Sequence, residues 1–139
     1  MIKPANLRAA LVTAYPPLAT NPDKLLVFAD AGIIAATGGP SPSFEYRYQL
    51  NLILLDFAGE PDRIFVALIE WVKTYQPDLV TNRDLRNTGI SFEVDILNDT
   101  TSDLAIKLQL TESVIVSVDA SGTRTITHVD DSNEQWTTP

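Results

Sequence analysis

The sequence predicts an α+β fold, a mostly antiparallel sheet with two main helices packed on it, and two patterns predict it. From Phe44 to Phe57 apolar and polar residues alternate, as in a strand covered on one face. From Pro61 to Tyr75 apolar residues recur at helical spacing. A chain of 139 residues has the size of one domain and buries about 68% of its unfolded surface. We therefore expect a single domain over residues 1–129 and a flexible acidic tail over residues 130–139.

The chain opens with an amphipathic helix. Pro4 suits the first turn, where a helix does not need the missing N–H, and Tyr15-Pro16-Pro17 ends the segment. Between them the apolar residues repeat at helical spacing: Leu7, Ala10, Leu11 and Ala14. One face of this helix is expected to pack on the sheet.

Two short apolar runs follow, separated by a turn-forming sequence. Leu25 to Ala29 and Ile33 to Thr37 are typical of strands, and Asp30-Ala31-Gly32 lies between them. This spacing predicts a tight hairpin. The two glycines and two prolines of Gly38 to Pro42 predict a loop before the next strand.

The run from Phe44 to Phe57 is the most informative segment. One face holds apolar and aromatic residues, namely Phe44, Tyr46, Tyr48, Leu50, Leu52 and Leu54, and the other begins with Glu45, Arg47, Gln49 and Asn51. After Asn51 the second face also becomes apolar, through Ile53, Leu55 and Phe57, so we expect this end to be buried on both sides. Because 14 residues is long for a strand, its outer half is expected to project beyond the domain body.

The second half of the chain continues with a helix and further strands. Pro61 begins the helix, and Gln76-Pro77 ends it. Residues 78–89 show no clear period and are expected to be irregular. Ile90 to Ile96 and Leu104 to Leu110 alternate and should pair as a hairpin. Beyond them, Val114 to Val118 either continues the second strand or starts another, and Ala120-Ser121-Gly122 should turn the chain into Thr123 to Val129.

Composition excludes several classes of function. With 18 acidic and 10 basic residues, the net charge is −8, and the chain lacks the clustered Lys and Arg that bind nucleic acid through counterion release. It has no cysteine, which excludes disulfides, thiolate nucleophiles and zinc–thiolate sites. Its apolar runs are too short to span a bilayer, so we expect a soluble protein made in the cytoplasm.

The residues available for catalysis are few. The one histidine, His128, lies near the end of the chain, where we expect a solvated strand residue. A group of carboxylates could bind a divalent cation in a metal-dependent enzyme, although a solvated hairpin face is the favoured interpretation. This group comprises Glu93, Asp95, Asp99, Asp103 and Glu112. We expect no metal site and no enzyme.

The aromatic side chains on the long strand leave two interpretations open. Phe44, Tyr46 and Tyr48 share one face with leucines, and such a face is typical of sheet core. Because the strand is long enough to project, the same rings could instead pack on a neighbouring subunit.

Several of these segments resemble the tail-completion protein family of contractile-tailed bacteriophages, the GpR type. The similarity runs in order from about residue 1 to about residue 117. It rests on Lys3-Pro4 with Leu7-Arg8, Thr20-Asn21-Pro22-Asp23, Phe28, Asp30, Gly32, Ile34-Ala35, Thr37, Ser43-Phe44-Glu45, Arg47-Tyr48, Leu50-Asn51, Asp56-Phe57, Gly59, Trp71, Gln76-Pro77-Asp78 and Leu110-Thr111-Glu112. Beyond Val118 little can be matched.

The resemblance implies a structural virion protein similar to a tail terminator. Such a protein caps the head-proximal end of a contractile tail tube, ends tail polymerisation and prepares the head–tail joint, in a complete phage or in a headless phage-tail-like bacteriocin. The implied partners are further copies in a ring, commonly a homohexamer, with tail tube, sheath and head–tail connector proteins. The resemblance implies no catalysis, cofactor, membrane or sequence-specific nucleic acid, although DNA could pass through the ring. The implied location is the virion tail, reached from the bacterial host cytoplasm.

A ring of identical subunits needs two different, complementary surfaces on each subunit. We expect one surface at the outer half of the long strand and the turn before it. The candidate interface residues are Ala31, Gly32, Phe44, Glu45, Tyr46, Arg47, Tyr48, Asn51, Gln76 and Asp78. The acidic hairpin around Asp95, Asp99 and Asp103 could line a channel for DNA. The alternative is a monomeric tail-assembly chaperone or binding module.

Overall fold

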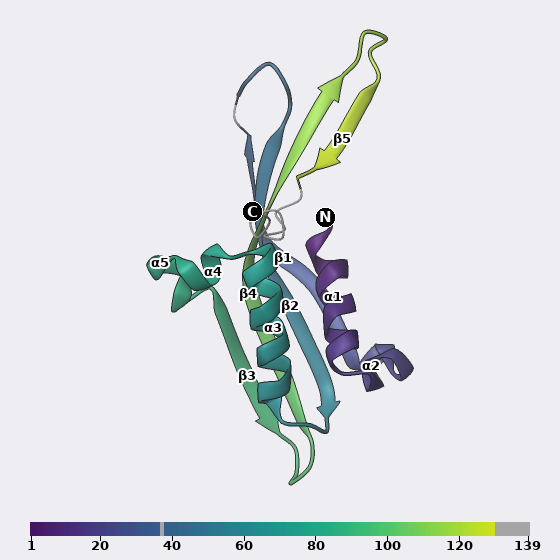
Figure 1. Ribbon diagram of the computed structural model, residues 1–139, viewed down its shortest axis with the longest axis vertical. Helices are drawn as coiled ribbons and strands as arrows, with labels where there is room; N and C mark the ends of the chain where they lie inside the picture. Colours follow the sequence, from purple (N-terminus) through teal and green to yellow (C-terminus); the bar gives the residue numbers. More distant parts are fainter. Residues whose placement is uncertain (37, 130–139) are drawn as a thin grey trace, which may run out of the picture.

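The computed structural model describes residues 1–36 and 38–129. Two longer helices lie on one face of a twisted antiparallel sheet (Figure 1). In chain order the elements are α1 (Lys3–Ala14), α2 (Pro17–Thr20), η1 (Pro22–Lys24), β1 (Leu25–Ala36), β2 (Phe44–Phe57), α3 (Pro61–Tyr75), α4 (Asp78–Thr81), α5 (Arg83–Arg86), β3 (Ile90–Ile96), β4 (Ser102–Val118) and β5 (Arg124–His128). The α+β prediction is confirmed.

The sheet has the order β1-β2-β4-β3, and β5 also pairs with β4. Every pair is antiparallel. β4 is 17 residues long: its first half pairs with β3, and its end, from Val114 to Val118, pairs with β5. The predicted β3–β4 hairpin is confirmed, and Val114 to Val118 continues β4.

The core lies between the helices and one face of the sheet. Leu7 and Leu11 of α1 and Ile64 and Leu68 of α3 are fully or almost fully buried. They pack on a ladder of leucine and isoleucine side chains from the central strands, namely Leu50, Leu52, Leu54, Leu104, Ile106 and Leu108. Trp71 plugs this layer, and its Nε1 donates to Asn6 Oδ1 at 2.9 Å, which joins α3 to α1. Burying one such side chain contributes about 1.5–3 kcal/mol.

The predicted hairpin at Asp30-Ala31-Gly32 is wrong. β1 is one strand, and the register shifts between Asp30 and Ile33, where Ala31 adopts φ 52°. Because β2 is long enough to pair with both apolar runs, the extra residues form a bulge rather than a turn. The predicted loop over Gly38 to Pro42 is confirmed, and the chain reverses there instead.

The expectation that the end of β2 is buried on both sides is also wrong. Ile53 is half-buried and Leu55 is 37% exposed, because both helices lie on the opposite face. Phe57 is buried for a different reason. The second register shift of β2, where Asp56 has φ 51°, brings Phe57 against Tyr15, with ring centroids 4.8 Å apart.

Residues 78–89, expected to be irregular, form α4 and α5, each a single turn. The side chain of Asn82 caps α5 by accepting the Asp84 N–H at 2.8 Å. Leu79 is buried in the core. Helices of four residues are too short to show a 3.6-residue period, which explains the wrong expectation.

Two hairpins extend past the helical layer (Figure 1). One joins β1 to β2, and the other joins β4 to β5. Two serines of the first hairpin contact the backbone of the second: Ser43 Oγ accepts the Val116 N–H at 2.9 Å, and Ser41 Oγ donates to the Val116 carbonyl at 2.6 Å. Residues 130–139, expected to form an acidic tail, lie outside the described residues.

Among residues 1–36 and 38–129, no helix has the length and apolarity needed to cross a membrane.

Candidate functional site

The edge of β4 has a gap between its two neighbours. β3 pairs with β4 as far as Leu108, and β5 pairs from Val114 onward. Within the gap, the Gln109 N–H donates to the Gly89 carbonyl at 2.9 Å, and the Ser113 carbonyl accepts the Val129 N–H at 2.9 Å. Thr111, between them, needs other partners for its backbone.

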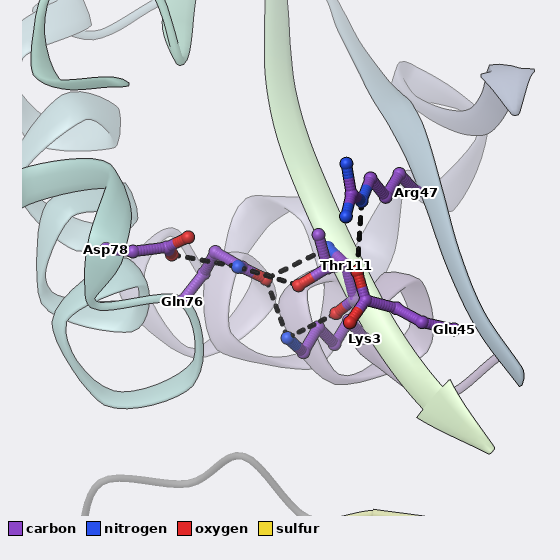
Figure 2. A network of polar contacts seen from close by, with 6 residues as sticks. All are labelled: Lys3, Glu45, Arg47, Gln76, Asp78 and Thr111. Atoms are coloured by element: carbon purple, nitrogen blue, oxygen red, sulfur yellow. Dashed lines mark hydrogen bonds and ion pairs between the residues drawn. The ribbon is translucent and has the colours of Figure 1, made fainter. Parts of the chain in front are cut away.

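Two buried side chains supply those partners (Figure 2). The Thr111 N–H donates to Gln76 Oε1 at 3.1 Å, and Lys3 Nζ donates to the Thr111 carbonyl at 2.7 Å. Lys3 Nζ also donates to Gln76 Oε1 at 2.7 Å, and Gln76 Nε2 donates to Asp78 Oδ1 at 2.9 Å. Lys3 and Gln76 therefore replace a missing strand and fasten α1 and the end of α3 to β4.

A second polar cluster lies beside the first on the helix-covered face. Glu112 is 1% exposed and accepts the Ile2 N–H at 2.8 Å and the Tyr48 hydroxyl. Burial, followed by the hydrogen bond to Glu112, raises the pKa of Tyr48. Burial and the charge of Glu112 also raise the pKa of Tyr46, to about 12. Both tyrosines therefore stay neutral at physiological pH, and Tyr48 remains a donor to the carboxylate.

His128 lies at the edge of this cluster. Its Nε2 is 2.9 Å from the amino group of Met1 and 3.4 Å from the Tyr46 hydroxyl. Neither contact is a serine hydroxyl or a carboxylate, so these contacts do not form a Ser–His–Asp arrangement. His128 is half-buried, which differs from the solvated position predicted for it.

The carboxylates proposed as a possible metal site do not lie together. Glu112 faces the helices, whereas Glu93, Asp95 and Asp103 lie on the opposite face of the sheet, where Asp95 pairs with Asp103 across the strands. Asp103 also accepts the Asp56 N–H at 2.9 Å. In the described part of the chain, no group of three or more histidine or acidic side chains is placed to hold a metal ion.

An apolar groove of about 380 Å³ lies beside the bulge of β1. Its lining residues are Met1, Ala29, Asp30, Gly32, Ile33, Ile34, Phe44, Tyr46, Arg47 and Tyr48. The rings of Phe44, Tyr46 and Tyr48 of β2 form a ladder along it, with centroids 6.0 Å apart for Phe44 and Tyr46 and 5.7 Å apart for Tyr46 and Tyr48. Tyr48 is buried in the core, whereas Phe44 and Tyr46 are half-buried. The core interpretation therefore holds for Tyr48, and packing on a neighbouring subunit stays a prediction for Phe44 and Tyr46.

The structure brings half of the ten predicted interface residues together in this groove: Gly32, Phe44, Tyr46, Arg47 and Tyr48. Ala31 lies in the adjacent bulge. Glu45 pairs with Arg47 at 3.0 Å on the helix-free face, where the Arg47 side chain is 65% exposed and the Glu45 side chain 39% exposed.

The other three candidates are used within the fold. Asn51 is buried and donates to Asp30 Oδ1 at 2.9 Å, and Gln76 and Asp78 belong to the network around Thr111. The partners Lys3, Thr111 and Glu112 were missed as interface residues. They lie in two of the runs that carried the family resemblance, Lys3-Pro4 and Leu110-Thr111-Glu112, and that resemblance was the one signal that could have grouped them.

The comparisons with known proteins agree with that resemblance. The family model described as P2 phage tail completion protein R (GpR) matches residues 1–132. Tail completion protein R of Escherichia phage P2 is 45% identical over 117 residues, which cover 84% of this chain and 76% of that protein. No solved structure matches. The match to the family model spans nearly the whole chain, and the chain therefore belongs to the P2 phage tail completion protein R (GpR) family.

Proposed function

We propose that this protein is a structural component of a contractile phage tail, or of a phage-tail-like bacteriocin, that forms a ring on the head-proximal end of the tail tube. The ring stops tube polymerisation and presents a surface to the head–tail connector. The observation that carries the proposal is the match to a tail completion family along nearly the whole chain.

Two features of the fold support an assembly role. The β1–β2 and β4–β5 hairpins extend past the helical layer and offer surface there (Figure 1). Several of their apolar side chains are exposed, including Ile34, Val118 and Ile126, whereas Val114 and Val116 are buried. Exposed apolar side chains gathered on projecting segments are typical of protein–protein contacts.

The acidic side of the sheet supports a more specific suggestion. Glu93, Asp95 and Asp103 lie on the helix-free face of β3 and β4, and Asp99 lies in the turn that joins these strands. If this face lines the central channel of the ring, its negative charge would prevent DNA that passes through the channel from binding to the protein. Binding of duplex DNA to the assembled protein at moderate salt would contradict this suggestion.

Electron microscopy of tails made with and without this protein tests the function. With the protein present, we expect tails of uniform length that end in a ring of added density and contain the protein. Without it, we expect tubes of irregular length or tails that fail to join heads. Normal, uniform tails in its absence would contradict the proposal.

The same preparations separate the ring from the alternative of a monomeric assembly chaperone. A chaperone leaves the finished particle, so the protein would be missing from purified tails although tails made without it are defective.

A further inference from the structure

The two edges of the sheet fit each other, and we propose that copies of this chain join edge to edge. In this contact the α4–α5 segment of one copy lies in the groove beside the β1 bulge of the next. The inference rests on the proposed ring and specifies its subunit contact.

The first edge is β1. None of the described strands pairs with its outer side, and β1 contains neither lysine nor proline, residues that commonly protect an exposed edge. Four large apolar side chains along it are exposed, namely Leu26, Phe28, Ile33 and Ile34. Such an edge offers backbone donors and acceptors together with apolar surface, and an added strand would use both.

The second edge is formed by β3, the α4–α5 segment and β5. Phe92 and Ile96 of β3 are 58% and 77% exposed, so this edge also carries unburied apolar surface. Figure 1 shows α5 protruding sideways from this edge of the sheet. The segment leaves the sheet where Gly89 accepts the Gln109 N–H and Gln76 accepts the Thr111 N–H.

The protrusion and the groove lie at the same level of the sheet. Across the strands, Gln109 pairs with Gln49 and Gln49 with Asp30, which is the last residue before the shift in register. Thr111 pairs with Arg47, and Arg47 pairs with Ile33, the first residue after it. A copy placed alongside without a vertical shift would therefore bring its α4–α5 segment opposite the bulge of its neighbour.

The strand directions permit this placement. Each neighbouring pair in β1-β2-β4-β3 is antiparallel, so β1 and β3 run in opposite directions. Two copies placed side by side, with their helices on the same side, would bring β3 next to β1 in antiparallel orientation. The contact joins two different surfaces, the kind of contact that closes a ring when the rotation between neighbours divides a full turn.

The charges are also complementary. Arg83 and Arg86 of α5 are exposed, and neither has an ion-pair partner among the described residues. Asp30 lines the groove on the other edge and, in the described structure, accepts hydrogen bonds only from the neutral amides of Gln49 and Asn51. Arg47 also lines the groove, but its charge is paired with Glu45 at 3.0 Å. A second copy, with two arginines at the level of the Asp30 carboxylate, is therefore the occupant that the groove fits.

Cysteine crosslinking tests the contact, because the natural chain has no cysteine. We expect the double variant Ile33→Cys with Arg86→Cys to give a ladder of disulfide-linked oligomers under oxidising conditions. The matched control is Ile126→Cys with Arg86→Cys, because Ile126 and Ile33 are similarly exposed, at 66% and 63%, and Ile126 lies on the wrong edge. The control should give no ladder. No ladder from the first pair, or equal ladders from both, would overturn the inference.

Charge neutralisation provides a second readout. Asp30→Asn keeps an acceptor for the two amides, and we expect it to weaken self-association about fivefold. Arg83→Gln with Arg86→Gln should weaken it by a similar factor, and combining all three changes should add little. Fully additive losses would contradict the contact. If the wild-type protein forms a ring but the cysteine variants give no crosslink and the charge variants show no coupling, this inference alone would be overturned. If the wild-type protein stays a monomer in the presence of tail tube, the ring itself would be overturned.

Discussion

The helix-covered half of the sheet and the half that projects beyond it use the same two central strands, but their side chains meet different surroundings. In the covered half Leu50 and Leu108 face each other with no exposed surface. In the projecting half Val118 is 56% exposed and Ile126 is 66% exposed. The covered half therefore supplies most of the buried core, whereas the extra length of β2 and β4 leaves apolar surface exposed, as the proposed assembly role requires.

Truncating one apolar side chain in each half should separate the two roles most clearly. Leu50→Ala removes a fully buried side chain and should lower the free energy of unfolding by about 2–5 kcal/mol. Ile126→Ala should change it by less than about 0.5 kcal/mol, because most of that side chain already contacts solvent. Urea denaturation at equilibrium measures both. Equal losses would show that the projecting hairpin belongs to the core.

The network around Thr111 joins the two halves, and removing it should have the next largest effect. Gln76→Leu takes the acceptor from the Thr111 N–H and from Lys3 Nζ, so we expect a loss of about 1–3 kcal/mol. Gln109→Leu is the matched control, because it makes the same substitution two residues from Thr111 on β4, at a side chain that is exposed. It should cost less than about 0.5 kcal/mol. Equal effects of the two variants would remove the structural role assigned to the network.

The tyrosines beside Glu112 should make stability sensitive to alkaline pH. The pKa of Tyr46 is raised to about 12 in the folded chain from its ordinary value of 10.0. The stabilisation of the folded state that comes from this shift is therefore complete below the ordinary pKa and is lost as the pH rises towards 12. Tyr46→Phe should therefore flatten the fall in unfolding free energy over this interval. Denaturation at several alkaline pH values measures it, and an unchanged slope in the variant would contradict the assignment.

The surface pair of Arg47 and Glu45 should contribute least to stability. Both side chains are exposed, so Arg47→Glu should change the free energy of unfolding by less than about 0.5 kcal/mol. Because Arg47 lines the groove that would receive Arg83 and Arg86 of the next copy, exchanging its positive charge for a negative one should raise the fraction of protein in the ring, as measured by sedimentation velocity. An unchanged fraction in this variant would exclude Arg47 from the contact.

Segments long enough to repeat their hydrophobic pattern several times could be predicted from the sequence. The bounds of β2 and α3 are those predicted, because 14 and 15 residues give each pattern several repeats. The bulge at Ala31 could not be predicted. Asp-Ala-Gly forms either a turn or a bulge, and the choice depends on whether β2 extends far enough to pair with both halves of β1.

Only those candidate site residues that share one face of a single strand could be grouped from the sequence. Phe44, Tyr46 and Tyr48 were grouped by their alternation, and they share the groove. Lys3, Gln76 and Thr111 come from three distant segments, and their contact depends on the gap between β3 and β5. A single sequence contains no pattern that reports such a gap, so this network could be found only from the tertiary structure.

The mass of the purified protein in solution tests the central claim most directly. Static light scattering across a concentration series, with and without tail tube protein, distinguishes a ring from a monomer. We predict one sharp multiple of the chain mass, 15.3 kDa, reached either by the protein alone or on addition of the tube. A mass that stays at that of a single chain at every concentration and with the tube present would contradict the account.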